Sequence, residues 1–366
     1  MDNKIRSITI KGYKSIVSLD NFQLNDLNVL IGANGSGKSN FVSFLLMLRE
    51  IVEKRLQTWT KKQGGADRLL SFGIKETSAL SASIRFGKNG YDIKLEPTVD
   101  GGFVFVNENL YFDGPKYGIT KPYLGSGHNE SLIPEEAENG NSKSVATFCL
   151  ETMKTWMVYH FHDTSVTAGV KRYGSIHDNE YLRNDASNLA AFLYKLSLED
   201  KDSYRQICKT IKLVIPFFSD FNLVPRKLPT EEEQINLGWK HKDSDYPFWP
   251  SQLSDGSLRF ICLATTLLQP NPPSVIVIDE PELGLHPYAI VILASLLRSA
   301  SKRMQVIIST QSVTLVNEFE MEELIIVESN NGKSSFNRYK NSEFSEWLDN
   351  YSLGELWEKN ILGGKP

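Results

Sequence analysis

The period of the hydrophobic and polar positions changes along the chain, and these changes predict strands and helices in alternation. Residues 5–16 alternate in polarity and residues 27–31 form a short apolar run, so both segments predict strands. A glycine-rich stretch follows, and residues 41–56 then carry apolar side chains at helical spacing. The start of the chain therefore predicts a strand, a glycine loop and a helix.

The second half of the chain repeats the alternation with more apolar strands. Residues 275–278 and 305–309 are apolar runs, whereas residues 258–268 and 288–301 have helical spacing. Buried strands that alternate with helices are typical of a parallel sheet covered on both faces, so we expect an α/β fold. Residues 324–328 predict one more strand.

The middle of the chain has a less regular pattern. Residues 79–112 contain three or four short alternating runs separated by KNG and VDGG, which predict an antiparallel meander. Residues 125–144 are polar and rich in glycine, and predict a mobile surface loop. The other predicted elements are strands over 156–162, 221–224 and 234–239, a helix that starts at 184–187, and a helix over 203–215.

Composition and charge narrow the class of protein. The 366 residues are 41% hydrophobic and 23% charged, and no apolar run is long enough to span a membrane. The three cysteines lie far apart without metal-ligand spacing, and the first residues contain no secretory pattern, so we expect reduced thiols and a cytoplasmic location.

Nucleic-acid binding gains no support from the overall charge. The formal net charge is −4, so a DNA contact would need a local basic patch. Such a patch requires the fold to gather four basic pairs, and scattered solvated charge is the simpler interpretation. The pairs are Lys54-Arg55, Lys61-Lys62, Lys171-Arg172 and Arg226-Lys227.

The glycine loop fits the phosphate-binding P-loop, Gly-x-x-x-x-Gly-Lys-Ser, and lies between a predicted strand and a predicted helix. Its glycines allow backbone N–H groups to surround a phosphate, Lys38 adds a positive charge, and the Ser39 hydroxyl suits Mg²⁺. ATP and Mg²⁺ are therefore the expected cofactors. The expected nucleotide-binding residues are Gly32, Asn34, Gly35, Ser36, Gly37, Lys38, Ser39 and Asn40.

An acidic pair after an apolar strand supplies the partner of the P-loop. Asp279 follows residues 275–278 and can hold the Mg²⁺ together with Ser39, as in other P-loop NTPases. Glu280, the next residue, can orient or deprotonate the attacking water. The expected catalytic residues of these two motifs are Glu280 and Lys38.

A second helix start has the composition of an anion site. Ser254-Asp255-Gly256-Ser257 would cap the helix that precedes the Asp279 strand, at the nucleotide end of the sheet but laterally away from Lys38. Such a site is useful if it serves the nucleotide of another chain, and a plain helix cap is the alternative.

Three motifs resemble those of the ABC-type ATPases. LSDGS at 253–257 is similar to their signature, GANGSGKSN at 32–40 to the P-loop of their SMC and RecF branch, and DEPELGLHP at 279–287 to that branch's Walker B motif and D-loop. The resemblance implies a head-to-tail homodimer with two ATP molecules between the chains, with higher oligomers open. Ser254 and Gly256 would then contact the partner's γ-phosphate.

Longer segments are similar to bacterial ATPases of the RecF/OLD-like kind, which occur in DNA repair and anti-phage settings. The similar segments are WMVYHFHDTS, NDASNLAAFLYKL, YPFWPSQLSDGSLRF, STQSVTLV and YSLGELWEKNILGG. We expect a P-loop NTPase of the ABC-head type, with a parallel or mixed central sheet, an antiparallel β subdomain and a helical insertion lobe. The expected domains are a split core (1–75 and 246–330), the β subdomain (76–124), a flexible loop (125–145), the insertion lobe (146–245) and a helical tail (331–366).

Several residues depart from the ABC pattern. Gln311 occupies the place of the switch histidine, which predicts slow hydrolysis that is insensitive to pH between 6 and 7. Gln63 is a weak candidate for the glutamine that couples Mg²⁺ to the neighbouring lobe, with a surface loop as the alternative. His286 could contact a dimer partner or cap a helix.

Two further groups carry weaker signals. His160 and His162 share one face of a predicted strand with Asp163 next, but no third metal ligand is evident, so a structural strand is the preferred interpretation. Tyr246, Phe248 and Trp249 before the signature are expected to pack in the interior.

The sequence as a whole predicts an ATP-driven dimerising switch. Fewer than 40 residues follow Val327, and no nuclease motif is evident, so we expect any nuclease or effector to be a separate partner, with DNA open as a further ligand. A nucleotide-gated scaffold with little turnover is the nearest alternative. A transporter subunit is disfavoured by the roughly 215 residues between P-loop and signature, and a small-molecule kinase by the signature itself.

Overall fold

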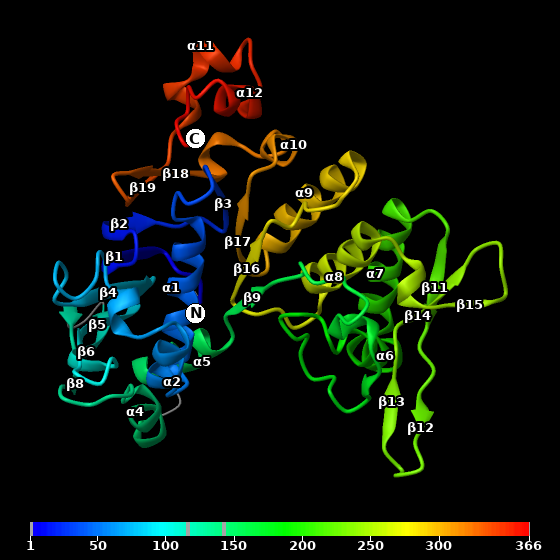
Figure 1. Ribbon diagram of the computed structural model, residues 1–366, viewed down its shortest axis with the longest axis horizontal. Helices are drawn as coiled ribbons and strands as arrows, with labels where there is room; N and C mark the ends of the chain where they lie inside the picture. The colour runs from blue at the N-terminus through cyan, green and yellow to red at the C-terminus, as the bar shows by residue number, and fades with distance from the viewer. Residues whose placement is uncertain (1–2, 115–117, 141–143, 366) are drawn as a thin grey trace.

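The computed structural model describes residues 3–114, 118–140 and 144–365. A six-stranded sheet runs through the centre of the molecule, with one lobe on each side (Figure 1). Its strand order is β19-β18-β3-β17-β16-β9. The strand bounds are β3 Leu27–Ile31, β9 Met157–Tyr159, β16 Val275–Asp279, β17 Gln305–Thr310, β18 Leu324–Asn330 and β19 Lys333–Asn337.

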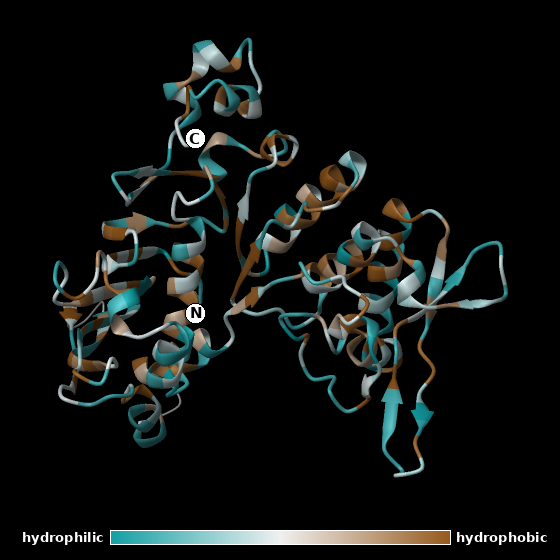
Figure 2. Cartoon of the chain, viewed as in Figure 1, coloured by the Kyte–Doolittle hydropathy of each residue, from teal (hydrophilic) through white to brown (hydrophobic). Residues whose placement is uncertain are grey.

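All pairings within this sheet are parallel except that between β18 and β19. The carboxyl ends of β3, β17, β16 and β9 therefore meet at one edge. Side chains alternate between two cores: Ile276 and Ile278 face one, and Val275 and Val277 face the other. The strands appear as hydrophobic bands in Figure 2. The predicted α/β class is confirmed, and burial on both faces explains the continuous apolar runs.

An antiparallel sheet and several helices build the described part of the first lobe (Figure 1). The strand order is β2-β1-β4-β5-β6-β7, and β8 also pairs with β6. The strands are β1 Ser7–Tyr13, β2 Ile16–Gln23, β4 Leu80–Phe86, β5 Asn89–Pro97, β6 Phe103–Gly114, β7 Gly118–Thr120 and β8 Tyr123–Gly125. The expected single strand over 5–16 is two strands, because the chain reverses at Lys14, whose φ is +44°. The sheet therefore extends beyond the expected 76–124 segment, of which residues 115–117 lie outside the description.

The expected loop over 125–144 contains a helix, α4 (Ile133–Asn139), whose first turn holds Pro134 and two glutamates. The buried carboxylate of Glu108 fixes the approach to it. This carboxylate accepts hydrogen bonds from the Ser131 hydroxyl at 2.5 Å and the Leu132 N–H at 3.0 Å. A long-range anchor of this kind leaves no local signal in the sequence; residues 141–143 lie outside the description.

The other helices of the first lobe are α1 Lys38–Val52, α2 Leu56–Lys62, α3 Ala66–Leu69 and α5 Val145–Lys154. The second lobe contains α6 Leu189–Glu199, α7 Lys201–Val214, α8 Asp255–Leu268 and α9 Pro287–Ser301. Two small sheets complete it, formed by β10 Gly174–Ser175, β12 Arg226–Lys227 and β13 Glu233–Ile235, and by β11 Phe218–Asn222, β14 Gly238–His241 and β15 Pro247–Phe248. Because β9 pairs with β16, the expected 146–245 insertion also supplies the edge of the central sheet.

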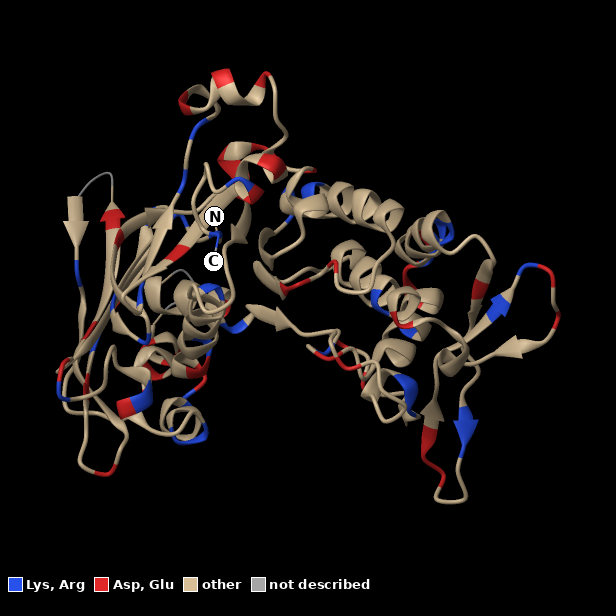
Figure 3. Ribbon diagram, turned by 45° about the horizontal axis from the view of Figure 1, so that its top comes forward, with Lys and Arg blue, Asp and Glu red and all other residues tan. Residues whose placement is uncertain are grey.

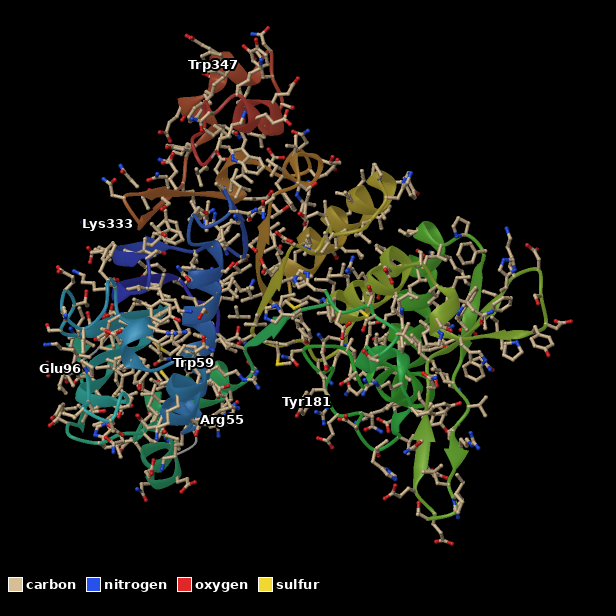
Figure 4. The ribbon with its side chains drawn as sticks, viewed as in Figure 1. Arg55, Trp59, Glu96, Tyr181, Lys333 and Trp347 are labelled. Atoms are coloured by element: carbon tan, nitrogen blue, oxygen red, sulfur yellow. The ribbon has the colours of Figure 1, made fainter. Side chains whose placement is uncertain are left out.

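The C-terminal segment packs on the core through α10 (Val313–Val316) and α12 (Leu353–Glu358). The Gly354 N–H donates to Asn317 Oδ1 at 2.6 Å, and Leu356 is fully buried. Trp347 of α11 (Ser345–Leu348) is 45% exposed at the outer end of this segment (Figure 4). Across the described residues, every helix is too short or too polar to cross a bilayer.

Candidate nucleotide-binding site

The P-loop connects β3 to α1 at the carboxyl edge of the central sheet. Its backbone depends on glycine at two positions. Gly37, the N-cap of α1, has φ of +116°, and a Cβ there would overlap the Ser334 hydroxyl of β19; a Cβ at Gly32 would overlap the Val327 carbonyl of β18. The loop is thus held against the strands that follow it in the sheet.

Lys38 is buried within the curve of this loop. Its ammonium donates to the carbonyls of Gly32 at 2.6 Å and Ala33 at 2.9 Å. Burial lowers the pKa of Lys38, whereas the nearby Asp279 and Glu280 act to raise it. Within the described chain no carboxylate forms a salt bridge with Lys38, so its charge faces a pocket that accepts an anion.

The pocket beside Lys38 has polar walls and a volume of about 130 Å³. Within it the Ser36 hydroxyl is buried and makes no hydrogen bond in the described part of the chain. A buried hydroxyl without a partner is costly unless a ligand satisfies it. The residues present therefore fit nucleotide phosphates. The lining residues are Asn34, Gly35, Ser36, Gly37, Lys38, Ser39, Asn40, Asp279, Glu280 and Gln311.

The acidic wall of the pocket comes from the end of β16. Asp279 accepts a hydrogen bond from the Ser309 hydroxyl of β17. Glu280 adopts a left-handed backbone with φ of +44°, and its N–H donates to the Ser309 carbonyl at 2.8 Å. A left-handed residue other than glycine costs about 1–2 kcal/mol and marks a position where side-chain direction matters. This backbone directs the Glu280 carboxylate into the pocket.

Gln311 links the two halves of the pocket. Its amide Nε2 donates to Asn34 Oδ1 and to Glu280 Oε1, each at 2.7 Å. The first acceptor belongs to the P-loop and the second to the acidic wall. Gln311 follows β17, so the structure brings together the catalytic residues expected from three separate strands.

Gln63 does not join these residues. It is the C-cap of α2, which follows the far end of α1, whereas the P-loop lies at the start of α1. The 15 residues of α1 span roughly 22 Å. Gln63 is therefore too far from Ser39 and Asp279 to share a metal ion with them, and its candidate role in Mg²⁺ coupling was wrong.

The signature residues lie outside the pocket of their own chain. Ser254 is the N-cap of α8, and its hydroxyl accepts from the Ser257 N–H at 3.1 Å. A Cβ on Gly256 would overlap the Gly284 carbonyl, so the start of α8 packs against the segment after Asp279. Neither Ser254 nor Gly256 lines the pocket described above.

Comparison with known proteins supplies the family. Residues 27–317 match the family model described as "AAA domain, putative AbiEii toxin, Type IV TA system". The chain belongs to this AAA domain family. No curated protein matches the sequence significantly.

Solved structures of SMC heads resemble the chain. An SmcHead bound to the C-winged helix domain of ScpA has a TM-score of 0.61 at 15% identity, covering 93% of this chain and 99% of that one. An Smc head with an extended coiled coil, bound to the C-terminal domain of ScpA derived from Pyrococcus furiosus, has a TM-score of 0.57 at 14% identity, covering 94% and 98%. At this identity the likeness shows the fold: this AAA domain is a P-loop ATPase with the fold of an SMC head.

The AAA domain contains two functional candidates that the motifs do not reveal. Arg259 of α8 donates to the carbonyls of Phe161 at 2.9 Å, His162 at 2.9 Å and Leu283 at 3.0 Å. Glu282 is largely buried below the pocket, where it accepts from the Thr310 hydroxyl at 2.5 Å, and burial raises its pKa. For Arg259, the sequence signal was an arginine inside an otherwise apolar helix. For Glu282, the local sequence contains no such signal.

The histidines have different positions from those expected. The strand predicted over 156–162 ends at Tyr159, so His160 and His162 lie beyond it and are exposed. Their neighbour is Asp279, which no sequence pattern connects to them. Burial lowers the pKa of His160. His286 caps α9: its Nδ1 accepts from the Tyr288 N–H at 3.3 Å.

The aromatic stretch before the signature is only partly internal. Phe248 packs on Trp239 with ring centroids 4.7 Å apart. Tyr246 is 78% exposed and Trp249 43% exposed. The expectation that all three aromatic residues pack inside was therefore wrong for Tyr246 and only half right for Trp249, because β15 ends at the molecular edge.

Proposed function

We propose that this chain is an ATP-hydrolysing switch that dimerises around ATP. One observation carries the proposal: Lys38, Asp279, Glu280 and Gln311 line one pocket, whereas the second phosphate-type helix start, at Ser254, lies outside it. The start of this helix is too far from the nucleotide of its own chain to bind it. In a head-to-tail pair of chains, it would instead bind the nucleotide of the partner.

The pocket residues divide the chemistry between them. The P-loop amides and Lys38 would hold the β- and γ-phosphates, and Ser39 and Asp279 would hold Mg²⁺, which would supply charge neutralisation when bound. Glu280 positions the attacking water and accepts its proton. Gln311 reports the presence of phosphate, because its amide already contacts both the P-loop and Glu280.

The surface around the signature supports pairing of two chains. Leu283 is 42% exposed and Tyr288 53% exposed, and both lie close to the Gly284 turn that packs against Gly256. Exposed apolar side chains beside an anion-binding helix start suit an interface that closes on a nucleotide. Ser254 and Gly256 would contact the γ-phosphate of the partner's ATP.

The family and the sequence resemblance support a biological setting. The family model is described as a putative AbiEii toxin, and the sequence resembles RecF/OLD-like ATPases, so we propose a cytoplasmic role in anti-phage defence or DNA repair with a separate nuclease or effector as partner. The similar SMC heads were solved with a ScpA domain bound, which supports a protein partner.

Direct DNA binding has less support. Lys and Arg residues are spread over both lobes (Figure 3). Arg55 pairs with Glu50 and Lys54 with Glu135, whereas Arg226 lies on β12 in the other lobe. The four basic pairs therefore do not form one patch.

ATP turnover by purified chains tests the enzymatic part of the proposal. We expect Mg²⁺-dependent phosphate release by the wild type and a fall of about 100-fold or more in Glu280→Gln, because the variant lacks the general base. Binding of ATP should persist, since the P-loop is unchanged.

Glu96→Gln is the matched control, because Glu96 lies on β5 at the outer side of the first lobe (Figure 4). Its turnover should equal that of the wild type. If wild type and Glu280→Gln both bind ATP but release no phosphate, with DNA present or absent, the chain is a nucleotide-gated scaffold and the enzymatic proposal fails.

A further inference from the structure

Two histidines and the Walker B aspartate meet at the carboxyl edge of the central sheet. β9 and β16 are parallel neighbours in which Tyr159 lies opposite Ile278. The next residues, His160 and Asp279, therefore leave the sheet side by side. One ligand atom from each of His160, His162 and Asp279 lies within 4.8 Å of the other two.

The backbone carrying the histidines is anchored on both sides. The His160 N–H donates to the Asn184 carbonyl at 3.0 Å, and the carbonyls of Phe161 and His162 accept from Arg259. Phe161 is buried between the two exposed histidines. Positions fixed in this way keep the imidazoles beside Asp279 without fixing the rings themselves.

Neither imidazole has a hydrogen-bond partner within the described residues. The rings contact each other, with centroids 6.3 Å apart, and both keep their nitrogens available. Donors around a tetrahedral metal ion with bonds of about 2.0–2.2 Å are about 3.3–3.6 Å apart. Side-chain rotations that move the donor atoms by about 1 Å would therefore bring all three donors onto one ion.

We propose that His160, His162 and Asp279 bind a divalent first-row transition metal ion, such as Co²⁺, Ni²⁺ or Zn²⁺. Imidazole suits these ions, whereas Mg²⁺ selects oxygen ligands in a near-ideal octahedron. Three protein ligands leave further coordination positions open. The proposal goes beyond ATP hydrolysis and does not depend on it, because all three ligands come from the chain itself.

The position of this site connects it to the nucleotide pocket. Asp279 belongs to both, since it also lines the pocket with Ser39 and Glu280. An ion held by the two histidines would thus occupy the wall of the phosphate pocket. The ion would add positive charge beside the phosphates and fix the Asp279 carboxylate.

Metal binding by nucleotide-free protein without a polyhistidine tag tests the proposal. Co²⁺ is the probe, followed by its visible absorption and by equilibrium dialysis with an excess of Mg²⁺ present. We expect one tight Co²⁺ per wild-type chain. His160→Ala and His162→Ala should each bind it at least about tenfold more weakly, because loss of even an indirect ligand contact costs that much.

His177→Ala is the matched control, because His177 is also exposed but lies outside the cluster. It should bind Co²⁺ as tightly as the wild type. Melting curves without metal establish that the variants fold. Equal Co²⁺ affinity of the wild type and the His160→Ala/His162→Ala double variant would overturn the proposal, and so would complete displacement of Co²⁺ by excess Mg²⁺. Neither readout involves ATP, so failure here is distinct from failure of the ATPase proposal.

Discussion

At the scale of single residues, Gln311 joins the two sides of the candidate nucleotide pocket. Its amide contacts Asn34 of the P-loop and Glu280 of the acidic wall at the same distance. An amide carries no proton that titrates near neutral pH, unlike an imidazole. If phosphate binding moves Asn34 or Glu280, the uncharged Gln311 amide would therefore transmit that movement to the other residue.

Substitution of Gln311 should change both the rate and its pH dependence. Gln311→Ala removes two hydrogen bonds and should lower kcat by about tenfold, equivalent to roughly 1.4 kcal/mol. Gln311→His should make turnover fall as the pH decreases from 7 to 6, since a protonated imidazole would pair with Glu280 and block its action as a base. The wild-type rate should stay flat over that interval, as phosphate release at each pH would show. A wild-type decline as steep as that of Gln311→His would refute this role.

Glu282 provides a pH-dependent test of stability. Burial raises its pKa above the usual glutamate value, so the folded protein binds this proton more tightly than the unfolded chain. Protonated Glu282 contributes to the free energy of unfolding at low pH. This contribution is lost as the pH rises from the pKa of Glu282 in the unfolded chain to its higher pKa in the folded protein. Glu282→Gln should therefore melt at a higher temperature than the wild type at pH 7, and the difference should disappear near pH 4.

Thermal melts across this pH range check the expectation. The exposed substitution Glu96→Gln should follow the wild type at every pH. A Glu282→Gln melting temperature below that of the wild type at pH 7 would show that the carboxylate stabilises the fold instead.

Among the residues, the P-loop, Asp279 and Glu280 could be predicted from sequence because each motif is contiguous and its chemistry fixes the residue types. The cluster of His160, His162 and Asp279 could not, because it depends on which strand lies beside β16. Gln63 was wrongly placed because its motif match was weak, and α1 carries the chain away from the P-loop before α2 begins.

At the scale of elements, α8 contacts both the turn after Asp279 and the segment that carries the two histidines, and it begins at the signature. Ser254 caps its start, Gly256 packs on the Gly284 turn, and Arg259 binds carbonyls from the end of β9 and from the same turn. A shift of α8 would therefore move the turn after Asp279 and the histidine segment with it.

Arg259→Lys should separate this positioning role from simple stability. Lysine keeps the charge but cannot reproduce the arginine fork, so loss of carbonyl contacts should cost about 1–3 kcal/mol and lower ATP turnover. Arg303→Lys is the matched variant. Arg303 donates to the Leu267 and Gln269 carbonyls at the other end of α8.

Melting temperature and ATPase rate should be measured for both variants. Both should melt earlier than the wild type, but only Arg259→Lys should lose turnover. Equal loss of turnover in the two variants would indicate a general effect of instability and not a role in positioning the site.

The bounds of α7, α8 and α9 follow their sequence signals closely, because apolar spacing and caps such as Ser254 are local. The helix predicted over 41–56 is α1, which starts at Lys38 and already ends at Val52. α4 and the split between β1 and β2 were missed. The first is ordered by Glu108 from a distant strand, and the second by a left-handed lysine that no turn motif marks.

At the scale of the whole molecule, the central sheet divides the chain into two lobes that share the nucleotide edge (Figure 1). The α/β class followed from buried strands alternating with helices. The domain limits did not, because the chain leaves the first lobe, adds β9 to the central sheet and then builds the second lobe. Sequence segments therefore do not coincide with structural lobes.

In the proposed pair, the signature is a phosphate site for the neighbouring chain, so its role belongs to two chains and not to one. Ser254 lies outside its own pocket, so its substitution should leave ATP binding at Lys38 intact. An arginine at this position would place a long side chain where the partner's γ-phosphate is expected. Pairing should then fail although the pocket is unchanged.

The most direct measurement is the mass in solution of Glu280→Gln with and without ATP, by analytical ultracentrifugation, compared with Glu280→Gln/Ser254→Arg. We expect an ATP-dependent doubling of mass for the first protein, and a mass that stays at one chain for the second while ATP binding is retained. A Glu280→Gln protein whose mass does not change with ATP, or a Glu280→Gln/Ser254→Arg protein that still pairs, would contradict the proposed ATP-bound dimer.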